Sequence, residues 1–144
     1  MRRRLRIPAA LWVAAGSALG ACARWGLGLW LQGGVTIIGL PWGTLAANVA
    51  GSGLIGLYAA VTGPQGRLQA PPAQRQFVMA GFCGGFTTFS LFTAELLGAL
   101  QLGQPGWAAL ILATSVVAWL LGIWAGHAAG TRLSNRHSHS QKPG

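Results

Sequence analysis

The sequence predicts an all-α membrane protein with four transmembrane helices. Of its 144 residues, 52% are hydrophobic and only 8% are charged. The apolar residues form four stretches, each reaching the roughly 20 residues that cross about 30 Å of hydrocarbon. They are Ile7–Leu31, Pro41–Thr62, Arg75–Leu100 and Pro105–Ala129. We therefore expect one membrane domain at 1–130 and a polar, disordered cytoplasmic tail at 131–144.

The first stretch follows four arginines, an arrangement that could also begin a signal peptide. Its apolar run is longer than that of a normal signal, and Arg24 interrupts any clean cleavage pattern, so we expect an uncleaved helix. Arg24 could cap a helix end, attract anions to a vestibule, or extend to the interface. Gly16 and Gly20 are four residues apart, which lets helix backbones approach closely.

The second stretch begins at Pro41-Trp42, where proline suits a first helical turn and tryptophan suits a membrane interface. Thr44, Asn48 and Ser52 are spaced four residues apart, so they share one helix face. An amide inside a membrane is costly unless it is hydrogen-bonded or meets water. Two interpretations of Asn48 remain open: it bridges two helices, or it is a donor lining a pore.

The third stretch contains the most unusual composition, Gly-Phe-Cys-Gly-Gly-Phe-Thr-Thr-Phe-Ser-Leu-Phe-Thr-Ala-Glu at 81–95. Gly84-Gly85 can leave helical geometry at low cost, so we expect a broken helix there. Unwound backbone at membrane depth is tolerated where protein buries it or water reaches it, and its free carbonyls suit a bare cation. The alternative is a glycine kink with ordinary packing. Hydroxyl groups follow at Thr87, Thr88 and Ser90.

Two aromatic residues and one acid complete this stretch. Phe89 and Phe92 are three residues apart and share a helix face. Such pairs usually belong to a core, but the positive edge of a phenyl ring can also contact a small anion beside Asn48. Glu95 is the only acidic residue of the chain. It could relay protons, or it could meet hydroxyl groups or the interface near the helix end.

The fourth stretch begins at Pro105-Gly106-Trp107 and ends in glycines at four-residue spacing. Gly122, Gly126 and Gly130 favour close helix packing. Thr114 and Ser115 could add hydroxyl groups to a polar track or bond their own backbone carbonyls.

The positive charges are distributed asymmetrically. Nine of the ten Lys and Arg residues lie before the first stretch, around the loop between the second and third, or after the fourth. These three regions lie on one side of a four-helix topology, which predicts cytoplasmic termini for a multi-pass inner-membrane protein. Basic patches interleaved with aromatics are absent, which argues against a nucleic-acid partner. The sequence has no converging catalytic set and no nucleotide motif, so we expect neither an enzyme nor an organic cofactor.

Three motifs carry a resemblance to a known family. They are Gly16-Ser17-Ala18-Leu19-Gly20-Ala21-Cys22-Ala23-Arg24, Gly43-Thr44-Leu45-Ala46-Ala47-Asn48-Val49-Ala50-Gly51 and Gly81-Phe82-Cys83-Gly84-Gly85-Phe86-Thr87-Thr88-Phe89-Ser90. Over residues 14–125 the chain resembles the CrcB/Fluc family of fluoride ion channels. The resemblance implies an antiparallel dimer of four-helix subunits, with two fluoride pores and a structural sodium ion at the dimer centre.

The resemblance also implies roles for individual residues. Asn48 would be the pore amide, and Phe89 and Phe92 the ring-edge ligands of fluoride. The backbone carbonyls of Gly84 and Thr87, from both subunits, would bind sodium. The resemblance places five more residues along or near the polar track: Thr44, Thr88, Ser90, Glu95 and Ser115. Arg24 would lie near the aqueous vestibule of this track. The chain departs from the family pattern at Ser17, where a second glycine is common. It also departs at Ile111, where some relatives carry a hydroxyl-bearing aromatic.

We therefore expect passive export of fluoride, which lowers its toxicity in the cytoplasm. A negative-inside potential is worth about 2.3 kcal/mol per charge per 100 mV and drives anions outward. One alternative is a small multidrug-resistance-type four-helix transporter. Transporters of that type resemble one another in coupling transport through a membrane-embedded acid near the start of the first helix. This chain has no acidic residue in its first helix. A structural membrane-assembly subunit would explain the glycines but not Asn48.

The charge asymmetry bears on the partner. An antiparallel homodimer needs a chain that inserts in both orientations, whereas the Lys and Arg bias here favours one. We therefore expect an oppositely oriented paralogous subunit, with a homodimer in the lipid bilayer as the alternative.

Overall fold

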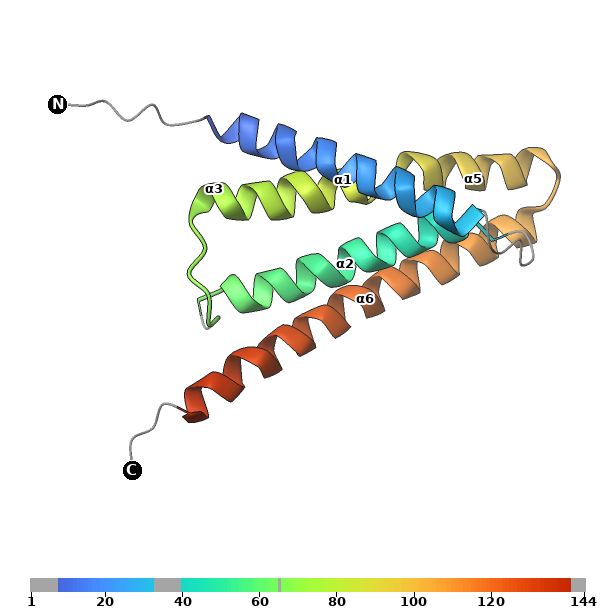
Figure 1. Cartoon of the computed structure of the whole chain (residues 1–144). Coiled ribbons are helices and arrows are strands. Elements are labelled where there is room, and N and C mark those ends of the chain that lie inside the picture. Colours follow the sequence, from blue (N-terminus) through green and yellow to red (C-terminus); the bar gives the residue numbers. More distant parts are fainter. Residues whose placement is uncertain (1–7, 33–39, 65, 141–144) are drawn as a thin grey trace.

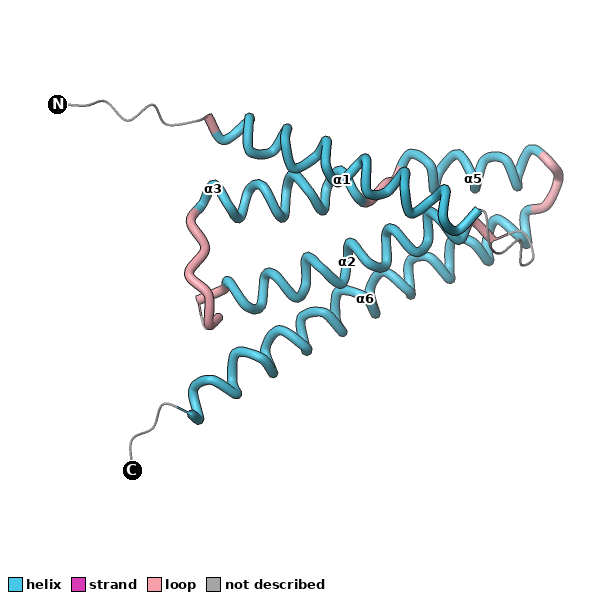
Figure 2. The backbone as a smooth tube through the Cα atoms, in the orientation of Figure 1, coloured by secondary structure: helices cyan, strands magenta, loops and turns pink. Residues whose placement is uncertain are grey.

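The computed structural model describes residues 8–32, 40–64 and 66–140, and these residues form a helical bundle (Figure 1). The helices in chain order are α1 (Ala9–Gln32), α2 (Trp42–Thr62), α3 (Pro72–Arg75), η1 (Gln76–Cys83), α4 (Gly84–Phe86), α5 (Ser90–Gln101) and α6 (Pro105–Ser140). Among the described residues there is no strand, and the described stretches between the helices are loops and turns (Figure 2). The prediction of an all-α fold is confirmed.

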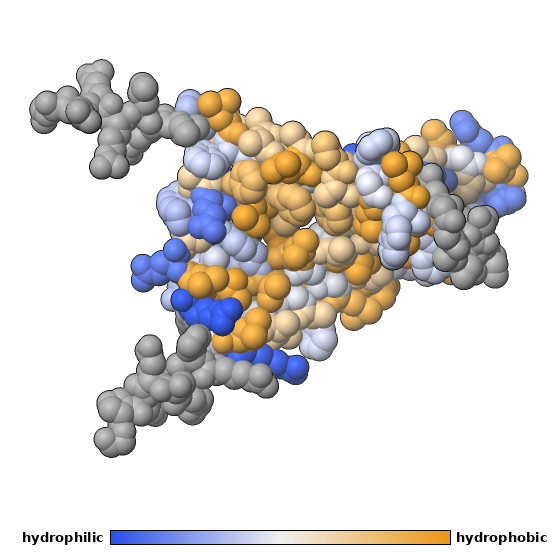
Figure 3. All heavy atoms as spheres, viewed as in Figure 1, coloured by the Kyte–Doolittle hydropathy of each residue, from blue (hydrophilic) through white to orange (hydrophobic). Residues whose placement is uncertain are grey.

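Three helical segments are long and apolar enough to cross a membrane: Trp42–Thr62, Pro72–Gln101 and Pro105–Asn135. In Figure 3, apolar side chains cover the middle of the visible face and polar side chains gather towards its ends. The 24-residue helix α1 is not among the three. Arg24 and several glycines lower its mean hydropathy. A fourth crossing through α1 therefore stays a prediction.

Helix α1 packs closely on Pro72–Gln101 through glycines of both partners. We call Pro72–Gln101 the third segment, because it contains the third apolar stretch of the sequence. A Cβ atom on Gly81 would lie 2.9 Å from the carbonyl oxygen of Val13. A Cβ atom on Gly16 would lie 2.8 Å from the amide of Phe82, and one on Gly20 would lie 2.7 Å from the amide of Phe86. The expected close approach at Gly16 and Gly20 is therefore confirmed.

Helices α2 and α6 make a second close contact of the same kind. A Cβ atom on Gly122 would lie 2.9 Å from the Val49 carbonyl oxygen, and one on Gly130 would lie 2.8 Å from that of Leu57. Gly126 meets the backbone of Gly53 directly. Spacing by four residues thus predicts the contact face of α6 correctly.

The third segment leaves helical geometry at Thr87, not at the glycine pair. Gly84 has φ −64° and ψ −36°, which is helical, whereas Thr87 is extended, with φ −81° and ψ 158°. The expectation of a break at Gly84-Gly85 is therefore wrong by two to three residues. Gly85 serves another purpose, because a Cβ atom there would overlap the backbone of Ser17.

A tight turn returns α5 along α6. Gly103 has φ 69°, a conformation that favours glycine. The amides of Leu102 and Gln104 bond the carbonyls of Gly98 and Ala99, at 3.1 and 3.0 Å. These bonds pair carbonyl groups at the end of α5 with donors. The turn then brings α5 against α6.

Helix α6 continues through 131–140, the first ten residues of the tail that the sequence predicts to be disordered. Extending an existing helix adds one hydrogen bond for each residue fixed, so propagation is easier than nucleation. The remaining tail residues, 141–144, lie outside the described part of the chain.

Candidate functional site

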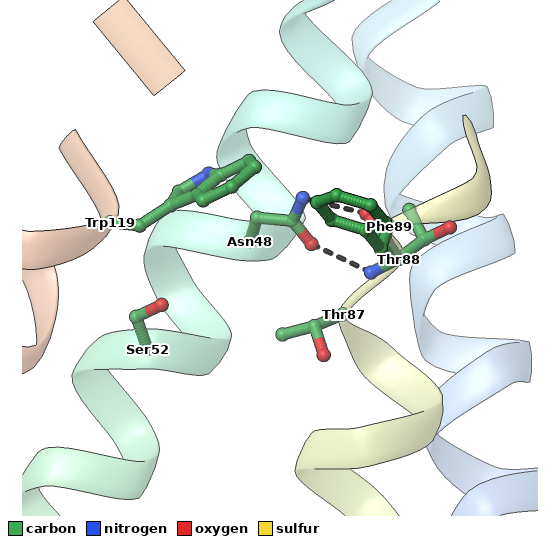
Figure 4. A pocket seen from close by; sticks show the side chains of 6 residues that line it. All are labelled: Asn48, Ser52, Thr87, Thr88, Phe89 and Trp119. Atoms are coloured by element: carbon green, nitrogen blue, oxygen red, sulfur yellow. Dashed lines mark hydrogen bonds between the residues drawn. The ribbon is translucent and has the colours of Figure 1, made fainter. Parts of the chain in front are cut away.

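Asn48 is bonded to the backbone where the third segment is interrupted. Its Nδ2 donates to the carbonyl of Thr88 at 2.9 Å, and the amide of Thr88 donates to its Oδ1 at 2.7 Å (Figure 4). One buried side chain therefore satisfies both polar groups of a residue that has left the helix. Asn48 therefore bridges α2 and the third segment, and its interpretation as a pore donor stays a prediction. Because an amide nitrogen carries two hydrogens, one N–H remains outside this pair.

A cavity of about 210 Å³ opens beside this amide (Figure 4). Its lining residues are Asn48 and Ser52 from α2, Thr87, Thr88 and Phe89 from the interruption, and Trp119 from α6. Sequence reasoning did not select Trp119. The residue lies four positions after Ser115, so helical spacing along α6 could have found it.

Phe89 and Phe92 form a contacting pair with very different environments. Their ring centroids are 5.6 Å apart, with an angle of 51° between the planes. Phe92 is buried inside the bundle at 2% exposure and makes an edge contact with Trp119 at 4.8 Å. Phe89 is 69% exposed. Within the single chain, therefore, Phe92 lies in the interior of the bundle and Phe89 lies on its surface.

The interruption releases backbone carbonyls from the helical pattern, those of Gly84 and Thr87 among them. The amide of Thr88 would donate to Gly84 in an unbroken helix, but it donates to Asn48. The amide of Leu91 would likewise donate to Thr87, but it donates to the Thr88 hydroxyl at 3.2 Å. Gly84 is exposed, and a Cβ atom there would have no neighbour within 4 Å. The two carbonyls of the expected cation site are therefore among those that lose their usual backbone donors.

A second polar cluster lies between α1, α2 and α5. Arg24, Thr44 and Glu95 help to line a cavity of about 250 Å³. The hydroxyl of Thr44 donates to Glu95 Oε1 at 2.6 Å, and Glu95 Oε2 is buried without a partner in the described part of the chain. Arg24 Nε donates to the carbonyl of Gly85 at 3.5 Å, which favours the helix-end interpretation of this arginine.

The remaining hydroxyl candidates do not form one continuous group. Ser90 Oγ lies 3.2 Å from the Thr88 hydroxyl, next to the first cavity. Ser115 is buried on α6 but lines neither cavity. Thr114 donates to the carbonyl of Leu110 in its own helix at 2.7 Å, which is the backbone-bonding alternative.

Residues 11–127 match the family described as CrcB-like protein, Camphor Resistance (CrcB). The chain belongs to the CrcB family. The matched range includes every residue of the two polar clusters, from Arg24 to Trp119. The expected family is therefore confirmed.

Curated CrcB relatives are named as ion channels. "Fluoride-specific ion channel FluC 1" of Rhodopseudomonas palustris is 47% identical over 134 residues, which cover 90% of this chain and 93% of that protein. "Fluoride-specific ion channel FluC" of Rhodospirillum rubrum is 46% identical over 127 residues, covering 86% and 95% respectively. CrcB proteins are therefore channels and not enzymes, as the sequence predicts.

Proposed function

We propose that this chain is a subunit of a fluoride channel that lets fluoride leave the cytoplasm passively and so lowers its toxicity. The observation that carries the proposal is the pairing of Asn48 with Thr88. It holds the amide rigidly and leaves one N–H beside a cavity whose lining is uncharged.

Fluoride is small and strongly hydrated, so a pathway must replace its water with other donors. The second N–H of Asn48, nearby hydroxyl groups and the edges of Phe89 and Phe92 supply them. No fixed positive charge lines this cavity to trap the ion. The names of the relatives support this assignment.

A structural sodium ion would fit the released carbonyls of Gly84 and Thr87. Unwound backbone carbonyls are suitable ligands for sodium in membrane proteins. Gly84 is exposed, so carbonyls of a second subunit could approach the same ion. In this arrangement the ion holds the interruption and the dimer centre together and takes no part in conduction.

A partner subunit would also cover the face that contains Phe89. This ring and Leu91 are exposed in the single chain, next to buried Phe92. An antiparallel partner could bring a second copy of the interruption to this face. The subunit would then cross the membrane four times, through α1, α2, the third segment and α6, with both termini in the cytoplasm.

The partner that the charges favour is a paralogous subunit of opposite orientation. The nine Lys and Arg residues on one side favour one insertion direction, whereas a homodimer of antiparallel copies needs both. Equal amounts of the termini on both membrane faces, or channel activity from this chain alone, would instead support the homodimer.

Fluoride efflux from liposomes tests the proposal. The chain is reconstituted alone and then with any co-encoded homologue, and released fluoride is followed with an electrode. We expect efflux that Asn48→Asp and Phe92→Ile each reduce at least about tenfold, because each removes a contact to a charged ion. Gln74→Glu, the same amide-to-acid change at an exposed position in α3, is the control. Absence of efflux under both conditions, or unchanged efflux in both site variants, would refute the pore assignment.

A further inference from the structure

Three buried polar atoms have no hydrogen-bond partner in the described part of the chain: Tyr58 Oη, Glu95 Oε2 and Trp119 Nε1. Of these three residues, only Trp119 lines the cavity beside Asn48. An indole nitrogen is a donor and never an acceptor. A buried donor without an acceptor is costly, so the site is incomplete until an acceptor arrives.

The position of the indole is set by packing. Trp119 meets Phe92 edge-on, with 4.8 Å between ring centroids and 72° between planes. Phe92 is itself buried. In Figure 4 the indole extends from α6 towards Asn48 on α2. The two side chains therefore approach one cavity from two helices, and each carries an N–H group.

The chemistry of this cavity indicates the acceptor. Asn48, Ser52, Thr87, Thr88, Phe89 and Trp119 contain no charged group. Two neutral N–H donors with ring edges suit a small monovalent anion, which accepts hydrogen bonds and donates none.

We propose that Trp119 Nε1 donates a hydrogen bond to the permeating anion, opposite the amide of Asn48. This inference rests on the proposed fluoride conduction and adds a ligand from α6 to it. It also gives the buried indole nitrogen of half-buried Trp119 a function beyond the packing of its ring on Phe92.

The sharpest test replaces the indole of Trp119 with benzothienylalanine, which keeps the bicyclic shape and exchanges the N–H for sulfur. Trp119→Phe is the simpler companion variant. Fluoride efflux is measured at low fluoride on the complete channel, with any partner subunit it requires. We expect efflux at least about tenfold slower, because a hydrogen bond to an ion is lost. The same replacements at Trp124, which is 70% exposed on the same helix, should leave efflux unchanged.

A second measurement does not depend on conduction. Ultraviolet resonance Raman spectra of tryptophan report hydrogen bonding of the indole N–H. Fluoride in place of gluconate should shift this signal in the wild-type protein, and the shift should be lost in the Trp119 variants but kept in the Trp124 variants.

The outcomes separate the two proposals. A wild-type channel that passes no fluoride contradicts the proposed function. Normal efflux with benzothienylalanine at position 119 overturns the role of Trp119 while leaving that function intact. If the variants do not fold, an unchanged wild-type spectrum on addition of fluoride overturns it as well.

Discussion

Asn48 and Thr88 are 40 positions apart in the chain and exchange two hydrogen bonds, of 2.9 and 2.7 Å. A side chain of α2 thereby takes the place of the helical partners that Thr88 loses at the interruption. The same pair fixes an amide at the cavity wall and frees the carbonyl of Gly84. Fold and candidate site consequently depend on one contact.

Asn48→Leu should destabilise the subunit strongly, because it leaves the N–H and C=O of Thr88 without partners inside the bundle. Each orphaned group costs about 1–3 kcal/mol. Thr88→Ser is the matched control, because it keeps both backbone groups and the hydroxyl that Leu91 bonds, and it should cost much less. Thermal unfolding in detergent compares the two. Equal midpoints for the two variants would show that the pair does not support the fold.

Parts of this arrangement follow from spacing along the chain. Glycines four residues apart predict the faces where α1 and α6 meet their neighbours, because only close backbone approach requires them. The pairing of Asn48 with Thr88 does not follow in the same way, because helical spacing gives a face but not the residue opposite. The interruption was expected at Gly84-Gly85 because glycine leaves a helix easily. In the fold, Gly85 is needed against Ser17, and Asn48 stabilises the interruption further on.

Trp119 shows a second limit of sequence reasoning. A tryptophan in an apolar segment is typical of an interface belt or a lipid-facing surface, and Trp124 on the same helix is indeed exposed. The inward position of Trp119 depends on Phe92, a residue of α5 that reaches α6 only through the turn at Gly103. Spacing from Ser115 gives the face of α6 that carries Trp119, but it does not give Phe92 as the residue opposite.

Gly20→Ala should lower the stability of the bundle by about 1–3 kcal/mol, the usual cost of overpacking. The added methyl group would meet the backbone at Phe82 and Phe86, which cannot move away like a flexible side chain. Gly26→Ala in the same helix is the control, since a Cβ atom there has no neighbour within 4 Å. Denaturant or thermal unfolding of both variants measures the difference. A Gly26 variant as unstable as the Gly20 variant would contradict the close-packing explanation.

Thr44 and Glu95 should be energetically coupled, because their 2.6 Å hydrogen bond is the only contact that satisfies this carboxylate among the described residues. A double-mutant cycle of unfolding free energies, with Thr44→Val and Glu95→Met, tests this coupling. We expect a coupling energy of about 0.5–3 kcal/mol, as is found for residues in direct contact. Thr114→Val combined with Glu95→Met is the control cycle, because Thr114 bonds its own helix. If the effects of Thr44→Val and Glu95→Met on the free energy of unfolding simply add, the two side chains are not energetically coupled.

Sodium should stabilise the assembled channel if the carbonyls of Gly84 and Thr87 bind it. Each tenfold increase in sodium above its dissociation constant should add about 1.4 kcal/mol, whereas N-methylglucamine at equal ionic strength should add nothing. Thr87→Val keeps both carbonyls and should keep this dependence. Asn48→Leu should weaken it, because the side chain that holds the backbone at Thr88 out of the helical pattern is then lost. Unfolding midpoints across a sodium titration measure all three proteins. A wild-type midpoint that ignores sodium would eliminate the cation site, and a full sodium dependence in Asn48→Leu would separate that site from the Asn48–Thr88 pair.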